Sequence, residues 1–345
     1  MHTDRNRCRS VELEQHVTAR PARVLVAPDS FKGTFSALDA GAAIAEGLVD
    51  ARLEVVVCPV ADGGEGTLAV VAGALHGELR AAACRDALAR PIVAEFVLLD
   101  RGRTALVEAA AAIGLPMIAD TERDAEASTS AGVGDLIVAA LAHDVEHLIV
   151  SVGGVASTDG GRGAIDIVTG CSAGVAMTVL CDVDTVFEDA AVVFGPQKGA
   201  DQQAVVRLTE GLNRYAETLP RDPRGIPRTG AAGGLSGGLW AAFGADLVSG
   251  AEYVLDLLDF DSLVAGVDVV VTGEGAFDGQ SLRGKVVGEV IRRAAAASVP
   301  CFVVAGRTDF EELPAGVRSV VIASTREELV AAGREIAAIT TATTR

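Results

Sequence analysis

Residues 24–58 read VLVAPDSFKGTFSALDAGAAIAEGLVDARLEVVVC, and this stretch decides the fold. The apolar run at 24–27 predicts a buried strand, which a polar loop follows. Ser36 is a good helix N-cap, and small apolar residues then recur at helical spacing. A second apolar run at 55–58 predicts the next strand. A strand, a helix and a strand in this order favour a parallel sheet with right-handed crossovers.

Similar units recur along the rest of the chain. Apolar runs predict further strands at 148–152, 175–181, 267–272, 301–305 and 317–322. Helical patterns occupy 68–75, 201–218, the segment from about 286, and 326–339.

We therefore predict two α/β domains around a cleft. The first is a discontinuous Rossmann-like parallel sheet built from residues 23–76 and 251–345. The second is an inserted α/β domain over residues 77–250. Residues 1–22 are polar and have no period, so we expect a disordered leader there.

Composition excludes several classes of protein. Half of the 345 residues are apolar, and the formal net charge is −18. A strongly acidic chain is a poor binder of nucleic acid or of an anionic membrane surface. Six scattered cysteines without a Cys-x-x-Cys pair indicate a reducing compartment, and the start of the chain lacks a signal-peptide core. We expect a cytoplasmic protein that acts on small molecules, with oligomerisation left open.

The loop at 279–285 reads GQSLRGK, which matches G-x-x-x-x-G-K. A P-loop needs Ser or Thr next, but Val286 stands there, which argues against a true P-loop. Glycine backbone amides and a helix N-terminus still attract phosphate, and Lys285 would add a positive charge. The alternative is a glycine-rich turn with a solvated lysine.

The loop at 61–67, ADGGEGT, holds Asp62 and Glu65 between glycines. Mg²⁺ prefers one or two carboxylates together with substrate phosphates, so both are candidate metal ligands or partners of substrate hydroxyls. Gly63 and Gly64 would let the backbone approach a ligand closely. Asp62 could instead serve as the N-cap of the helix that follows.

The stretch 153–161, GGVASTDGG, follows a predicted strand. Its backbone amides and Ser157 could hold an anion, and Asp159 could act as a base; a tight turn without a ligand is the alternative. Asp182 ends another strand, while Lys32 and Lys198 lie in loops.

No histidine lies in a glycine-rich loop, which makes a histidine base or a histidine zinc site improbable. A carboxylate base suits phosphoryl transfer, in which positioning and charge neutralisation dominate.

Taken together, these loops resemble the bacterial glycerate kinase family. The matching segments are APDSFKGTFSA at 27–37, PVADGGEGT at 59–67, GVGDLI at 132–137, GGVASTDGG at 153–161, CDVD at 181–184, VFGPQKGA at 193–200, GAAGGLSGGL at 230–239 and TGEGAFDGQSLRGK at 272–285. They follow the family's order and span almost the whole chain after the leader.

The resemblance implies ATP-dependent, Mg²⁺-dependent phosphorylation of D-glycerate to a phosphoglycerate, in a cleft between two α/β domains. We assign catalytic roles to Asp159 or Asp278 as base and to Lys285. Candidate substrate and phosphate contacts are Lys32, Asp62, Gly63, Gly64, Ser157, Lys198, Gly279, Arg283 and Gly284. Candidate metal ligands are Asp62, Glu65 and Asp182.

The chain departs from the family at three places. Val155 and Thr158 stand in a segment that the family usually writes GGSATNDGG, and Thr185 and Val186 follow CDVD where the family usually has Asn and Pro. The region between 163 and 175 is shortened by a few tens of residues. These differences leave two alternatives open: a kinase for another small hydroxy or sugar acid, and a non-catalytic ligand-binding relative.

Overall fold

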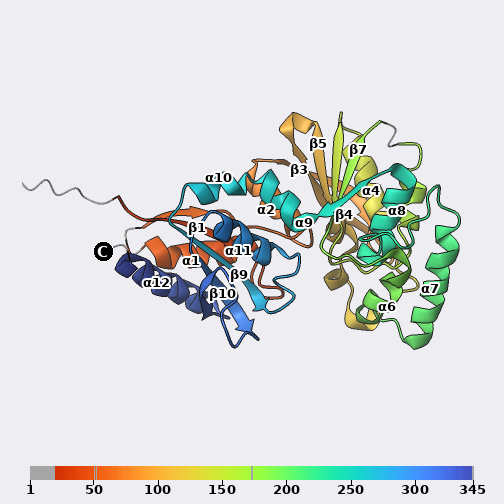
Figure 1. Ribbon diagram of the computed structural model, residues 1–345. Coiled ribbons are helices and arrows are strands. Elements are labelled where there is room, and N and C mark those ends of the chain that lie inside the picture. The colour runs from red at the N-terminus through yellow and green to blue at the C-terminus, as the bar shows by residue number, and fades with distance from the viewer. Residues whose placement is uncertain (1–19, 50, 52, 172–173, 344–345) are drawn as a thin grey trace, which may run out of the picture.

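The computed structural model describes residues 20–49, 51, 53–171 and 174–343. They form two lobes, each with its own sheet (Figure 1). The predicted α/β class is confirmed. Most of the expected leader, residues 1–19, lies outside the described residues. No described helix is long and apolar enough to cross a membrane.

The first sheet is fully parallel and has the strand order β11-β10-β9-β1-β2. From β1 the chain moves to β2 on one side, and from β9 it moves to β10 and β11 on the other side. The order therefore reverses between β1 and β9, and such switch points are where α/β sheets bind ligands. The strands are β1 (Arg23–Pro28), β2 (Glu54–Val57), β9 (Val269–Phe277), β10 (Cys301–Thr308) and β11 (Val317–Ile322).

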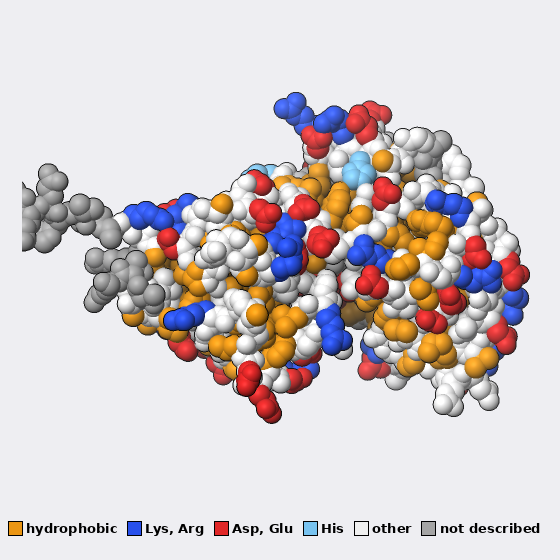
Figure 2. Space-filling model, viewed as in Figure 1, with side chains coloured by type: hydrophobic (Ala, Val, Ile, Leu, Met, Phe, Trp, Pro, Cys, Tyr) orange, Lys and Arg blue, Asp and Glu red, His pale blue; other side chains and the backbone are white. Residues whose placement is uncertain are grey.

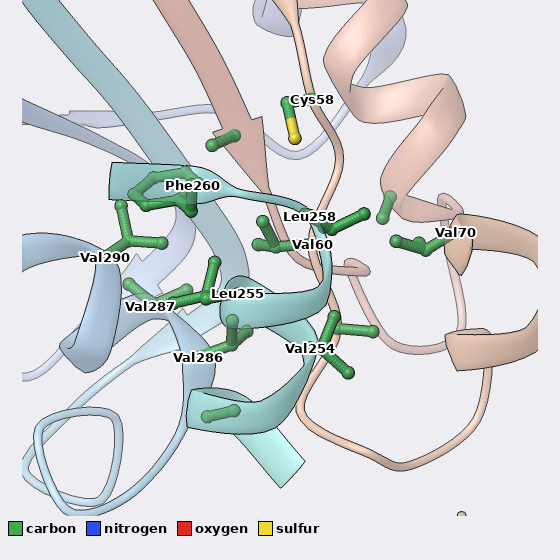
Figure 3. Packing of buried hydrophobic residues seen from close by; sticks show 14 of the residues in the cluster. Cys58, Val60, Val70, Val254, Leu255, Leu258, Phe260, Val286, Val287 and Val290 are labelled. Atoms are coloured by element: carbon green, nitrogen blue, oxygen red, sulfur yellow. The ribbon is translucent and has the colours of Figure 1, made fainter. Parts of the chain in front are cut away.

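Helices cover both faces of this sheet, which explains why its strands read as unbroken apolar runs. On β1, Val24 and Val26 pack against one pair of helices, while Leu25 packs against the opposite group. Figure 3 shows the second of these cores, in which side chains of α9 and α11 meet. The helices are α1 (Ala37–Val49) and α12 (Arg326–Thr343) on the first face, with α2 (Thr67–Ala74), α9 (Gly250–Leu257), α10 (Phe260–Ala265) and α11 (Val286–Ala296) on the second.

The second sheet is mixed and has the order β3-β4-β5-β6-β7-β8. β4 pairs antiparallel with both β3 and β5, and the remaining pairs are parallel. The strands are β3 (Glu78–Arg85), β4 (Pro91–Leu99), β5 (Thr104–Glu108), β6 (His147–Ser151), β7 (Ala176–Cys181) and β8 (Asp246–Ser249). Of these six strands, the apolar runs in the sequence predict only β6 and β7. The pattern is weak at β3, which is a largely exposed edge strand, and at β8, which is short.

Short helices surround this second sheet. They are α3 (Ala109–Ile113), α4 (Ala131–Leu141), α5 (Arg162–Val168), α6 (Ala190–Phe194), α7 (Gln202–Ala216) and α8 (Leu235–Phe243). Single 3₁₀ turns are η1 (Asp100–Gly102), η2 (Leu115–Met117), η3 (Asp120–Glu122), η4 (Phe187–Asp189), η5 (Pro196–Lys198) and η6 (Ala231–Gly234).

Strand β9 is longer than we predicted from its apolar run. It continues past Thr272 to Phe277, because its backbone pairs with β10 as far as Thr308. Glu274 is therefore a strand residue with a fixed direction, and only the segment after Phe277 is a loop.

The two lobes meet through glycines. A Cβ on Gly153 would lie 2.6 Å from the Cα of Gly64, and a Cβ on Gly63 would lie 2.9 Å from the Cβ of Leu180 on β7. The chain passes between the lobes twice, from α2 to β3 and from β8 to α9. Charged side chains of both signs gather where the lobes meet (Figure 2).

Helices α1 and α12 also touch through glycines, which gives a test of the packing. A Cβ on Gly47 would lie 2.0 Å from the carbonyl oxygen of Val330. We expect Gly47→Ala to lower the free energy of unfolding by about 1–3 kcal/mol, because the helices must move apart.

Gly211→Ala is the matched control, because Gly211 lies inside α7 with no atom within 4 Å of the added Cβ. It should raise stability by about 0.5–1 kcal/mol through helix propensity. Urea unfolding of both variants measures the difference, and equal shifts would contradict the packing argument.

Candidate active site

Lys32, in the loop after β1, lies where three cavities adjoin. The switch-point cavity, about 370 Å³, lies between the ends of β1 and β9 and is lined by Asp29, Asp62, Glu274, Asp278, Lys285 and Arg307. The inter-lobe cavity, about 300 Å³, is lined by Asp62, Glu65, Gly153, Gly154, Asp182 and Lys198. The apolar cavity, about 510 Å³, lies beside α1 and α2 and is lined by Phe35, Leu38, Val60, Ala69, Val70 and Pro116.

Carboxylates crowd around Lys32. Burial lowers the pKa of Lys32, but Asp62, Asp29 and Asp182 outweigh it and raise the pKa above its ordinary value. Lys32 therefore stays charged. It is the basic residue that all three cavities share, so an anion bound in any of them can reach it.

The carboxylates themselves repel one another. Burial, followed by the charge of Asp62, raises the pKa of Asp29 well above its usual value. The same two causes raise the pKa of Asp182 to about 6. Burial also raises the pKa of Glu274, whose Oε1 has no hydrogen-bond partner in the described part of the chain. The site thus holds more negative charge than Lys32 alone can balance.

The loop between β9 and α11 provides a positive end to the switch-point cavity. Lys285 is the N-cap residue of α11, and its side chain makes no capping hydrogen bond. The first N–H groups of a helix have no partner within the helix, so this end attracts anions. Asp278 Oδ1 accepts a hydrogen bond of 2.7 Å from the amide of Gln280, which fixes the carboxylate at the cavity wall.

Other candidates in this loop lie further out. Gly279 and Arg283 are exposed and do not line the switch-point cavity, and Gly284 adopts the left-handed conformation at φ +82°. Val286 is fully buried in the first lobe's core, so the position where a P-loop carries its hydroxyl packs against other apolar side chains.

The loop at 61–67 is held differently from our prediction. Asp62 Oδ1 accepts a 3.0 Å hydrogen bond from the amide of Gly64, and helix α2 has Gly66 as its N-cap. The alternative in which Asp62 caps this helix is wrong. Glu108, at the end of β5, accepts hydrogen bonds from the amides of Gly66 and Leu68 at 3.1 and 2.8 Å. Pattern reasoning missed Glu108, which comes from the other lobe.

The proposed metal ligands lie around the inter-lobe cavity but do not form a preformed cage. Asp62, Glu65 and Asp182 all line this cavity, and Glu65 is exposed. Across the described residues, no group of three or more His, Cys, Asp or Glu side chains has an arrangement that could hold a metal ion.

Asp159 and Ser157 do not join the other candidates. Asp159 Oδ2 accepts hydrogen bonds from the amide and hydroxyl of Ser130 at 2.9 and 2.8 Å, and Oδ1 accepts one from the amide of Gly161 at 3.0 Å. Asp159 lines a separate cavity of about 240 Å³ beside α7. The Ser157 side chain is fully buried and has no polar partner among the described residues.

Lys198 is a buried cation in the wall of the inter-lobe cavity. It is only 3% exposed, and its Nζ donates a 2.6 Å hydrogen bond to the carbonyl oxygen of Ser157. Burial lowers the pKa of Lys198 to about 7, although Asp159 acts in the opposite direction. A bound anion in this cavity would favour the charged form.

The residues that differ from the family's usual sequence line different parts of the molecule. Val155 lines the inter-lobe cavity, whereas Thr158 lines the separate cavity beside α7. The carbonyl oxygen of Thr185 accepts a hydrogen bond from Gly230, and Thr185 lines none of the three cavities around Lys32. Val155 is therefore the departure that can alter ligand contacts.

The fold and site define a class: a two-lobed α/β protein with glycine-rich loops and lysines around a cavity at a parallel-sheet switch point. The glycerate kinase family model matches residues 24–170 and 167–344, and the chain belongs to that family. The two matches adjoin in the region where we predicted a shortening.

Individual relatives agree with this assignment. The chain is 35% identical over 323 residues to a glycerate kinase of Bacillus subtilis, covering 82% of this chain and 85% of the relative. It is 34% identical over 303 residues to the glycerate 2-kinase of Escherichia coli, covering 76% and 80%. A crystal structure described as a glycerate kinase 2 from Salmonella typhimurium superposes with a TM-score of 0.82 at 31% identity, covering 94% of this chain and all of that one.

The lowered pKa of Lys198 gives a test by pH. The folded protein releases this proton near pH 7 and the unfolded chain near 10.5, so between these values the unfolded state binds more protons. Stability should therefore rise with pH in this window, by up to about 1.4 kcal/mol per unit, relative to Lys198→Met.

Chemical unfolding of both proteins from pH 7.5 to 9.5 measures the effect. Lys32→Met is the control. Because the pKa of Lys32 is raised, the stability that its charge contributes to the folded state is lost only above this pH window. Parallel pH profiles for the wild type and Lys198→Met would refute the lowered pKa.

Proposed function

We propose that this protein transfers the γ-phosphoryl group of ATP to the 2-hydroxyl group of D-glycerate. The observation that carries the proposal is the meeting of Lys32, Lys198 and Lys285 with six carboxylates around adjoining cavities, in a chain of the glycerate kinase family. The choice of the 2-hydroxyl follows the printed name of the Escherichia coli relative. Because ATP is the donor, we also propose a cytoplasmic location.

The triphosphate would lie in the switch-point cavity. Lys285 and the N-terminus of α11 provide positive charge at one end, and Lys32 provides it at the junction with the inter-lobe cavity. The γ-phosphate would lie near Lys32 and Asp62, which line both cavities. In-line transfer then requires an acceptor on the inter-lobe side of this junction.

We propose Mg²⁺ as the cofactor, held by Asp62 and Asp182 together with phosphate oxygens. The fit rests on the position of these two carboxylates in the wall of one cavity, where burial and repulsion from Asp62 also raise the pKa of Asp182. Mg²⁺ usually binds through one or two carboxylates plus phosphates, so a three-carboxylate cage is unnecessary. When bound, the ion neutralises charge on the phosphates. Glu65 is placed to contact a water ligand or a substrate hydroxyl.

D-glycerate would occupy the inter-lobe cavity. Lys198 would pair with its carboxylate, and the glycine backbone at 153–154 leaves room for a three-carbon acid. Val155 contributes an apolar wall next to the acceptor. The lobes that supply these contacts are distinct, so the acceptor is held between them.

We propose Asp278 as the base, because Asp159 is engaged by the amides and hydroxyl around it. The glycerate oxygen attacks the γ-phosphorus while the bond to the β-phosphate oxygen breaks, and ADP leaves. The 2-hydroxyl would point through the junction into the switch-point cavity, where the Asp278 carboxylate accepts its proton, while Lys32 and Lys285 offset the charge on the phosphoryl oxygens.

Phosphorus and carbon NMR of the product tests activity, acceptor and position in one measurement. The purified full chain with ATP, Mg²⁺ and D-glycerate should give 2-phosphoglycerate, and leaving out either Mg²⁺ or glycerate should stop ATP consumption. A panel of small hydroxy and sugar acids should give lower kcat/KM than D-glycerate. Absence of turnover with every acid would refute the kinase proposal, and a 3-phospho product would correct the position.

The choice of base is tested by a matched pair of variants. Asp278→Asn should lower kcat by roughly two to four decades with little effect on stability. Asp159→Asn should instead destabilise the fold by about 1–3 kcal/mol, since it disturbs buried hydrogen bonds, and should keep most of kcat at a temperature where it is folded. Steady-state kinetics with thermal unfolding separates the two, and the reverse pattern would identify Asp159 as the base.

A further inference from the structure

The apolar cavity beside Lys32 has no role in the chemistry described so far. Its walls come from the loop after β1, from α1, from the segment after β2, from α2 and, in the second lobe, from Pro116 of η2. Phe35, Leu38, Val60, Val70 and Pro116 give it a largely hydrocarbon lining. At about 510 Å³ it is the largest of the three cavities that adjoin Lys32, and it falls within the usual size range of small-molecule pockets.

The other two cavities are chemically unsuited to an aromatic base. The switch-point cavity is lined by four carboxylates and three cations, and the inter-lobe cavity by three carboxylates and two lysines. Placing a base there would remove these charges from water without providing partners, which is costly. Conversely, a phosphate or a hydroxy acid would find few partners on the apolar walls.

The cavity wall is preformed. Phe31 and Phe35 form an antiparallel bridge in which the amide of each donates to the carbonyl of the other, at 2.9 and 3.1 Å. The Phe35 ring meets the buried Phe31 ring edge-on, with ring centroids 6.5 Å apart. Gly33 and Gly66 border the cavity, and a Cβ on either would meet nothing within 4 Å. A flat ligand can therefore approach the backbone here.

We propose that the apolar cavity between α1 and α2 binds the nucleoside part of the phosphoryl donor, with the base packed among Phe35, Leu38 and Val70. Asp29, Ser30, Lys32 and Thr34 line both this cavity and the switch-point cavity. A nucleotide can thus lie with its nucleoside in the apolar cavity and its triphosphate bent around Lys32 inside the switch-point cavity, so that the γ-phosphate comes to Asp62 at the junction with the inter-lobe cavity. The inference rests on the proposed kinase function and adds the location of the donor.

Ala69 offers a variant that fills the cavity without changing a core. It lies on α2, is exposed and lines the apolar cavity. Ala69→Phe should block the base while leaving Lys32 and Lys285 in place. We expect the Kd of ATP to rise by at least about tenfold, the scale of one lost base-stacking contact. The Kd of inorganic tripolyphosphate and the KM of glycerate should stay within about twofold.

Ala42→Phe is the matched control, because Ala42 is exposed on α1 and lines none of the three cavities. It should leave all three constants unchanged. Calorimetric titration of the full chain with ATP, then with tripolyphosphate, needs no turnover. The location of the donor is therefore judged even if glycerate proves not to be the acceptor.

Two results would overturn the inference. If Ala69→Phe binds ATP as tightly as the wild type, the base lies elsewhere. If ATP and tripolyphosphate weaken equally, the variant has disturbed the phosphate site and not a base pocket. A chain that binds ATP in this way but phosphorylates no acid would refute the proposed function and leave the nucleoside site standing.

Discussion

The site depends on a close backbone contact between the lobes. The loop at 61–67 of the first lobe lies against Gly153 and Leu180 of the second lobe, so closely that Gly63 and Gly153 leave no room for a side chain larger than hydrogen. Each sheet also directs the carboxyl ends of its parallel strands toward this contact, so residues after β1, β6, β7 and β9 line adjoining cavities. A larger residue at Gly63 or Gly153 would separate the lobes and divide the site.

Charge is the second constraint, and it follows from the first. Bringing strand ends together also brings Asp29, Asp62, Asp182 and Glu274 around a single shared lysine, in a protein whose net charge is already −18. Burial, together with this repulsion, raises the pKa values of Asp29, Asp182 and Glu274. Such an arrangement is unfavourable without a cation, which supports our proposal that a divalent ion binds at Asp62 and Asp182.

Residues of the same type have different roles here because of their surroundings. Asp159 and Asp278 both lie in glycine-rich loops. Asp159 accepts hydrogen bonds that connect the 159–163 turn to the start of α4, whereas Asp278 lines the switch-point cavity. Glu108 supports the 61–67 loop from the opposite lobe. Lys198 is almost fully buried, so its proton is held less tightly than that of an ordinary lysine.

The sequence by itself determined the α/β class, the strands of the first sheet, and the glycine-rich loops that carry the site. It could do so because strands buried on both faces are continuously apolar and because the loops follow them directly. Hydrophobic periodicity did not find β3, β4, β5 or β8, and exposed or half-buried residues weaken the pattern in β3, in β8 and in the first half of β4. Only the tertiary structure decided that Glu274 and Asp29 join the site, that Asp159 leaves it and that an apolar cavity adjoins Lys32. These outcomes depend on which side chains from distant segments share a space, and contacts of that kind leave no local pattern along the chain.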